Sequence, residues 1–150
     1  MRAVRILPAI ILPLLTACSG DGIFGIRDYD FEGFYSYAGT VDDAAGDAVV
    51  GNVTITRQRG STALVSIAWT YLDNGEPIIE ITTDSPAVAD LGPDGLIEFE
   101  FEGDLFIEDK VVDFYLRHEG RLRGRTLTGI WEFDTGLPTN DAGSFTARRD

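Results

Sequence analysis

The sequence has few of the residues that build metal sites and nucleophilic catalysts. It contains one cysteine and one histidine among 150 residues. A lone cysteine cannot form an intrachain disulfide, and a lone histidine cannot supply a multi-histidine metal site. Residues 28–33, "DYDFEG", begin like a calcium-binding loop, but the twelfth position, which should be a bidentate glutamate, is Gly39. We therefore expect no metal and no cofactor.

Basic residues are also scarce. Twelve lysines and arginines stand against 25 acidic residues, which gives a formal net charge of −13. Such a surface repels phosphate backbones, so nucleic acid is a poor candidate partner, whereas a cationic protein is compatible with it. No Ser/His/Asp or Cys/His arrangement stands out, and we expect no enzymatic activity. The oligomeric state is left open.

No apolar run is long enough to form a membrane-spanning helix. The apolar stretch at residues 6–15 follows two arginines, Arg2 and Arg5, and precedes small residues. A spanning helix needs about 20 apolar residues, and this shorter pattern is typical of a secretory signal.

The signal ends in a specific four-residue motif. Leu15-Thr16-Ala17-Cys18 resembles the bacterial lipobox at every position. The resemblance implies cleavage before Cys18 and acylation of the cysteine, which would anchor the protein in a lipid bilayer. Residues 1–17 would then be a lipoprotein signal peptide, residues 18–30 the lipidated cysteine and a tether, and residues 31–150 the folded domain.

The lipobox resemblance also bears on location and charge. By similarity to lipoprotein sorting, Ser19 after the cysteine implies transfer to the outer membrane, facing the periplasm, with inner-membrane retention as the alternative. Removal of residues 1–17 takes away Arg2 and Arg5, so ten basic residues would face 25 acidic ones, a net charge of −15.

After residue 30 the hydrophobic pattern has a period of two, which is typical of β-strands. We expect eight strands, at residues 31–41, 48–58, 61–72, 77–83, 95–103, 111–122, 125–133 and 142–148. Turn-forming pairs such as Asn74-Gly75 separate them, and residues 84–92 are expected to be a non-strand excursion. The fold class predicted is all-β, an eight-stranded antiparallel up-and-down β-barrel, with a β-sandwich as the alternative.

The alternation also predicts which side chains face inward. They are Phe31, Tyr35, Tyr37, Val49, Val53, Ile55, Val65, Ile67, Trp69, Tyr71, Ile97, Phe99, Phe101, Phe114, Leu116, Leu122, Leu127, Trp131 and Phe133. The opposite faces carry charged residues such as Asp113, Arg117 and Glu119, which hydrocarbon would not tolerate, so a membrane-spanning barrel is excluded. Glu98 and its neighbours Glu100 and Glu102 are expected to lie on the solvated face near Arg117.

One motif resembles a known family. Gly129-Ile130-Trp131 is similar to the Gly-x-Trp motif of lipocalins, and the predicted barrel resembles the calycin group to which they belong. Lipocalins carry this motif on the first strand, whereas here it falls on the seventh. The resemblance therefore implies a lipocalin-like barrel but identifies no ligand-binding residue.

The predicted function is that of a membrane-anchored, exported lipoprotein whose β-barrel binds an apolar or amphipathic small ligand. The candidate ligand-binding residues are Tyr35, Tyr37, Trp69, His118 and Trp131. Inward glycines (Gly33, Gly39, Gly51 and Gly129) would make room for the ligand, although the many large inward residues favour a mostly filled core. The alternative is an envelope interaction protein or an inhibitor of a cationic exported protein.

Overall fold

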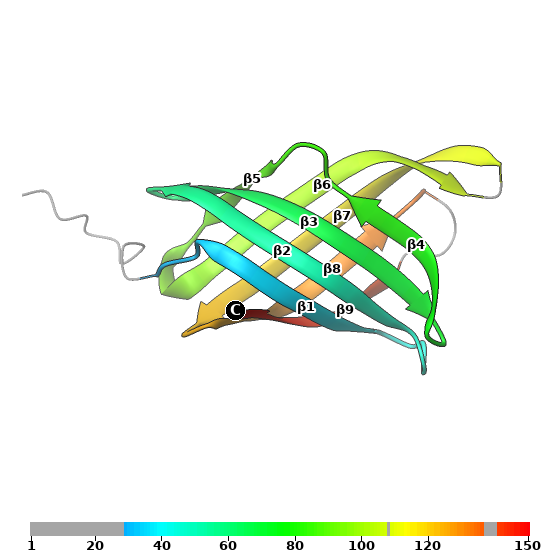
Figure 1. Ribbon diagram of the computed structural model, residues 1–150, viewed down its shortest axis with the longest axis horizontal. Helices are drawn as coiled ribbons and strands as arrows, with labels where there is room; N and C mark the ends of the chain where they lie inside the picture. The colour runs from blue at the N-terminus through cyan, green and yellow to red at the C-terminus, as the bar shows by residue number, and fades with distance from the viewer. Residues whose placement is uncertain (1–28, 108, 137–140) are drawn as a thin grey trace, which may run out of the picture.

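The computed structural model describes residues 29–107, 109–136 and 141–150. Almost all of this chain is β-strand (Figure 1). The strands are β1 (Gly33–Val41), β2 (Ala48–Arg59), β3 (Thr62–Asp73), β4 (Glu76–Thr82), β5 (Ala87–Leu91), β6 (Leu96–Ile107), β7 (Lys110–Arg123), β8 (Thr126–Asp134) and β9 (Asp141–Arg149). A single 3-10 turn, η2 (Pro93–Gly95), connects β5 to β6.

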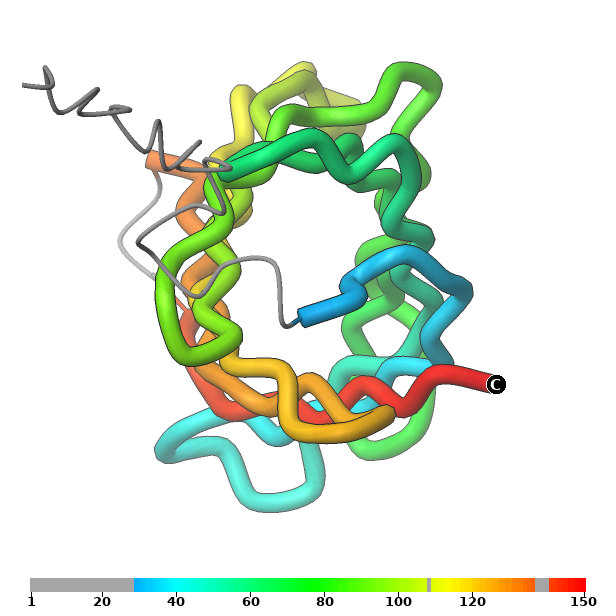
Figure 2. The backbone as a smooth tube through the Cα atoms, turned by 90° about the vertical axis from the view of Figure 1, so that its left-hand side faces the viewer, coloured from blue at the N-terminus to red at the C-terminus, as the bar shows by residue number. Residues whose placement is uncertain are grey.

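The strands form one antiparallel sheet that closes on itself. Its order is β2-β1-β9-β8-β7-β6-β5-β3-β4, and the additional pairing of β2 with β3 completes the ring. Figure 2 shows the backbone as a ring when viewed along the barrel. The predicted eight-stranded antiparallel barrel is therefore confirmed, with one extra strand, and the sandwich alternative is excluded.

The extra strand corrects one expectation. Residues 84–92 were expected to be a non-strand excursion, but Ala87–Leu91 is strand β5. β4 and β5 lie one after the other along β3, because β3 pairs with β4 through Ala68–Asp73 and with β5 through Thr62–Val65. The chain between them contains Pro86, which cannot donate a ladder hydrogen bond. Pairing with both β3 and β6 imposes strand conformation on a segment whose own composition favours it only weakly.

The barrel wall is incomplete on one side. β5 pairs with β6 through only two residue pairs, Asp90–Glu98 and Leu91–Ile97. Beyond them, the rest of β6 pairs with β7 alone within the described chain, and β4 pairs with β3 alone. We call the gap between β4 and the second half of β6 the seam.

The hairpin of β6 and β7 extends past the barrel. β8 accompanies β7 only as far as Tyr115, which pairs with Asp134, whereas the β6–β7 ladder continues to the pair Ile107–Lys110. In Figure 1 this hairpin, drawn in yellow, projects at the upper right, and β4 lies below it. Residues 103–107 and 110–114 therefore form a two-stranded ribbon beside the seam.

The interior is filled with large side chains. Of the 19 residues predicted to face inward, all but Phe114 are buried, and Phe114 is half-buried against the same core. The end of the barrel near the start of β1 is closed by Phe31, which is fully buried. The Gln58 side chain holds Phe31 in place, because it forms hydrogen bonds with the backbone of both Tyr29 and Phe31. We call Phe31 the plug, and this end of the barrel the plugged end.

The outer face carries the expected charges. Glu100 lies opposite Arg117 in the β6–β7 register, and the Arg117 guanidinium is 3.8 Å from a Glu98 carboxylate oxygen. Arg117 also approaches Glu119 and Glu132, at 3.9 Å each. These side chains are exposed, so each pair contributes at most about 1 kcal/mol.

Candidate functional site

A cluster of polar groups lies inside the barrel, around His118. β7 alternates so that Leu116, His118 and Leu122 face inward, and His118 has no exposed surface. Its Nε2 lies 3.1 Å from the hydroxyl of Tyr37 on β1, and its ring stacks on Phe99 at 4.8 Å between centroids. Apart from tyrosine and tryptophan, His118 is the only polar or charged side chain that is buried among the described residues.

Burial keeps both His118 and Tyr37 uncharged. Desolvation lowers the pKa of His118 from 6.5 to about 3, so the imidazole is neutral at ordinary pH. A neutral imidazole has one N–H and one bare nitrogen. Nε2 is engaged by Tyr37, and Nδ1 has no hydrogen-bond partner in the described chain. Desolvation also raises the pKa of Tyr37 far above its ordinary value, so that its hydroxyl stays protonated.

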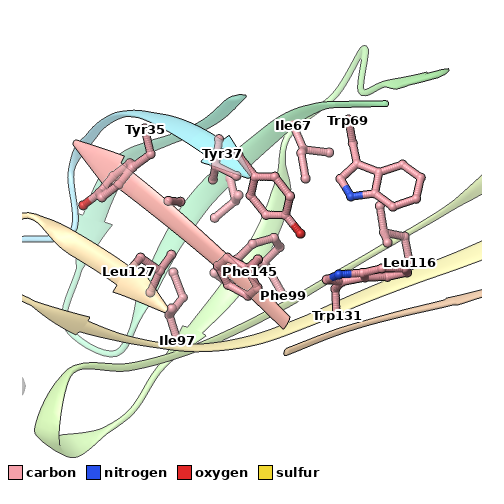
Figure 3. Close-up of a cluster of buried hydrophobic side chains, with 14 of the residues drawn as sticks. Tyr35, Tyr37, Ile67, Trp69, Ile97, Phe99, Leu116, Leu127, Trp131 and Phe145 are labelled. Atoms are coloured by element: carbon pink, nitrogen blue, oxygen red, sulfur yellow. The ribbon is translucent and has the colours of Figure 1, made fainter. Parts of the chain in front are cut away.

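The two tryptophans lie beside this pair. Trp69 on β3 and Trp131 on β8 meet edge to face, with centroids 5.6 Å apart. Trp131 donates from Nε1 to the Thr40 carbonyl at 3.2 Å. Trp69 Nε1 is buried beside the Tyr37 hydroxyl and acts to lower the pKa of that hydroxyl, against the larger effect of burial, but it makes no hydrogen bond of good geometry in the described chain. Figure 3 shows Tyr37 between the Phe99–Phe145 side of the cluster and the two indole rings.

Four of the five predicted site residues therefore come together, and the fifth does not. Tyr37, Trp69, His118 and Trp131 form the cluster just described. Tyr35 lies one layer nearer the plug, where its hydroxyl donates to the Phe31 carbonyl at 2.8 Å. Its hydroxyl points away from the cluster in Figure 3. Cys18 lies outside the described residues.

The inward glycines do not leave room for a ligand, which corrects a second expectation. A side chain at Gly51 would meet the Ala68 carbonyl, and one at Gly129 would meet the Glu119 carbonyl. At Gly39 the space is taken by Val49 and by the Trp131 indole. Beside Gly33 it is taken by Arg149. These glycines instead allow neighbouring chains and side chains to approach closely.

Open space lies at the seam. A hollow of about 380 Å³ is bordered by Glu80–Ser85 on one side and by Phe101–Leu105 and Phe114 on the other. A second hollow of about 530 Å³ lies on the other side of the hairpin, against Asp113–Tyr115 and Asp134–Gly136. Phe101 and Ile81 line the first hollow and are both almost fully buried, so they separate it from the interior.

The seam leads to the polar cluster through two aromatic rings. Phe101 packs edge to face on Phe99 at 5.8 Å, and Phe99 stacks on His118.

Sequence reasoning missed the seam because pairing between β4 and β6 is not a property of either strand alone. One available signal was "FEGDLFIEDKVVDF" (101–114), where strand-favouring apolar residues continue past the predicted strand end at residue 103.

Two further properties of the described chain concern classes of site. None of its helices is long and apolar enough to cross a membrane. Within the same residues, no group of three or more His, Cys, Asp or Glu side chains is arranged to hold a metal ion.

Comparison with known proteins identifies the architecture but no family. No protein-family model matches the sequence, and no curated protein matches it. The fold resembles EF1p2_mFAP2b bound to DFHBI, with a TM-score of 0.54 and 10% identity over 79% of this chain and 93% of that chain. It also resembles a redesigned β-barrel, mFAP1, bound to DFHBI, with a TM-score of 0.52 and 11% identity over 83% and 98% of the two chains.

Proposed function

We propose that this protein is an exported lipoprotein whose barrel binds a small apolar or amphipathic molecule. The lipobox at residues 15–18 supports export and anchoring through an acylated Cys18, with the barrel facing the periplasm from the outer membrane. The role is one of binding rather than catalysis. A ligand-sized hollow adjoining an aromatic interior is the physical basis for the binding role.

The observation that carries the proposal is the pair of unsatisfied polar atoms in the interior. His118 Nδ1 is buried without a partner in the described chain, and Trp69 Nε1, although it lies beside the Tyr37 hydroxyl, makes no hydrogen bond of good geometry there. Leaving a buried polar group unpaired costs about 1–3 kcal/mol. A ligand that offers an acceptor to the indole N–H would remove this cost, and the surrounding aromatic rings would bury its apolar part.

The interior is filled, so a ligand must displace a side chain to enter. Phe101 is the best candidate, because it separates the seam hollow from Phe99 and the polar cluster. It lies where β6 has lost its β5 neighbour, so this part of the wall has fewer constraints. The two barrels of similar fold were each determined bound to a small molecule, DFHBI, which is consistent with such a role for the architecture.

Two measurements test the proposal on a chain that begins at Ser19 and so retains every strand. Native mass spectrometry and solvent extraction would identify a co-purifying molecule. Titration with Nile red, a neutral aromatic dye with a carbonyl acceptor, should give a saturable increase in fluorescence. Trp69→Phe should weaken dye binding about tenfold, because it removes the unpaired donor and keeps most of the ring.

Trp131→Phe provides a matched control. Its indole N–H is already bonded to Thr40, so this change should lower stability and affect dye binding less than Trp69→Phe does. An empty chain that also fails to bind the dye saturably would contradict the proposal.

A further inference from the structure

The seam has two strand edges that face each other without being paired. The outer edge of β4 (Glu76–Thr82) and that of β6 from Phe101 to Ile107 have no ladder partner within the described chain. Unpaired edges present rows of N–H and C=O groups, which are templates for another strand. The hollow of about 380 Å³ lies between these two edges.

The charge of the seam is of one sign. Its charged lining residues are Glu80, Asp84, Glu102 and Asp104, and no basic residue of the described chain lines it. The second hollow, across the hairpin, is also lined by acidic residues alone among charged ones, including Asp113 and Asp134. A second copy of this chain would bring the same negative edges together, so charge complementarity favours a basic occupant.

The seam also has an apolar side. Along β6, Phe101 and Leu105 follow the inward parity, and on β4 Ile81 does the same. Glu102 and Asp104 on β6, and Glu80 on β4, follow the outward parity and are exposed. A strand laid between the two edges would therefore meet hydrophobic side chains on one face and carboxylates on the other.

The residues around the seam are unusually apolar for an exposed surface. Phe106 and Val111 face each other on the hairpin and are 72% and 67% exposed. Ile78 on β4 is 57% exposed. Acidic residues alone can simply protect an edge from aggregation, but exposed aromatic and β-branched side chains beside it do not serve that purpose.

We propose that the seam binds an extended basic segment of another protein, which enters as an additional strand between β4 and β6. The segment would alternate apolar residues, facing Phe101 and Leu105, with lysine or arginine, facing Glu102 and Asp104. This is strand addition at a sheet edge, in which backbone bonds give affinity and alternate side chains give specificity. The inference concerns the wall of the barrel and does not depend on small-molecule binding in its interior.

The test uses fluorescence anisotropy with the chain from Ser19 and a labelled peptide, Arg-Val-Arg-Val-Arg-Val-Arg. The peptide should bind saturably. The same peptide with every valine and arginine N-methylated keeps its charges but lacks backbone donors, and it should bind at least tenfold more weakly. A glutamate peptide, Glu-Val-Glu-Val-Glu-Val-Glu, should not bind.

Two charge-reversal variants locate the site. Glu102→Lys combined with Asp104→Lys should weaken peptide binding at least tenfold. Asp42→Lys combined with Asp150→Lys makes the same change in net charge away from the seam and should weaken binding by no more than about threefold through long-range attraction. Circular dichroism of both variants should show the unchanged β-sheet spectrum.

Four results would overturn the proposal. Equal weakening by the two pairs of substitutions would show only non-specific attraction to an acidic surface. Equal affinity for the N-methylated peptide would exclude a strand ladder, and absence of binding at millimolar peptide would exclude the site. A peptide-free dimer in sedimentation, abolished by Glu102→Lys and Asp104→Lys, would assign the seam to a second copy instead.

Discussion

His118 is a titratable residue in an aromatic core, and its protonation therefore opposes folding. The groups packed against it are Tyr37 from β1, Phe99 from β6 and Phe145 from β9, and only Tyr37 can titrate. Because burial lowers the His118 pKa from 6.5 to about 3, the unfolded chain binds a proton at a higher pH than the folded chain does. The contribution to stability is complete above pH 6.5 and is lost as the pH falls toward 3.

Because of His118, the folded protein should become less stable as the pH falls from 7.5 to 5. At pH 5 the free energy of unfolding should be about 2 kcal/mol lower than at pH 7.5 on account of His118 alone. His118→Gln removes the titration and keeps a hydrogen-bonding group for Tyr37. Urea unfolding of both proteins at the two pH values isolates the effect, because the carboxylates are common to both. Equal pH dependence in the two proteins would show that His118 does not titrate in this way.

Single-residue burial could be predicted from the sequence, but the polar cluster could not. Period-two alternation is a local property, so it correctly placed Tyr37 and Trp69 inside. Which inward residues meet depends on strand register. Phe99, His118 and Trp131 lie in one row across β6, β7 and β8, a row that no spacing within one strand reveals. The unpaired state of the Trp69 indole likewise depends on what surrounds it in three dimensions.

At the scale of elements, the break between β4 and β5 determines the shape of the wall. Thr83 maintains contact with β3 at the break, since its backbone N–H donates to the Ile67 carbonyl and its hydroxyl accepts from the Ile67 N–H, each at 3.0 Å. After Thr83 the chain turns through Asp84–Pro86 and resumes as β5. The sequence indicated the turn residues, but not that a strand would resume only four residues later.

The projecting hairpin is an element whose removal should leave the barrel intact. Replacing residues 105–112 by Asn-Gly would join Asp104 to Asp113, which already face each other in register. Most of the removed surface is exposed, so the free energy of unfolding should change by about 1 kcal/mol or less. Binding of the basic peptide should fall at least threefold, because the β6 border of the seam is shortened by Leu105, Phe106 and Ile107 while Phe101 to Asp104 remain.

Urea unfolding and anisotropy measure these two effects separately. The double substitution Phe106→Ser and Val111→Ser is the matched control, since it keeps the hairpin backbone and removes its exposed apolar side chains. Loss of the folded barrel on shortening would show that the hairpin stabilises the wall and is not an addition to it.

At the scale of the whole molecule, the two ends of the barrel differ. The plugged end carries Phe31 and the start of the described chain, which Arg149 ties down through bonds to the Asp30 carboxylate and to the Glu32 carbonyl. The seam and the hairpin lie toward the opposite end. Because Tyr29 and Asp30 are bonded to the barrel, residues 19–28 remain to bridge the distance to Cys18, and ten residues span at most about 35 Å. With Cys18 in a bilayer, the plugged end would thus lie nearer the membrane and the acidic seam farther from it.

Membrane attachment should depend on Cys18. Cys18→Ser in the full chain should move the protein from the membrane fraction to the soluble periplasmic fraction of a bacterial host, because a single-site diacyl anchor is the only attachment proposed. Mass spectrometry of the unaltered protein should show acylation at Cys18 and no residues before it. Ser19→Asp tests sorting, since it should increase the share retained in the inner membrane. A Cys18→Ser protein that has lost residues 1–17 by mass spectrometry and still stays membrane-bound after a high-salt wash would show that another part of the chain binds the membrane.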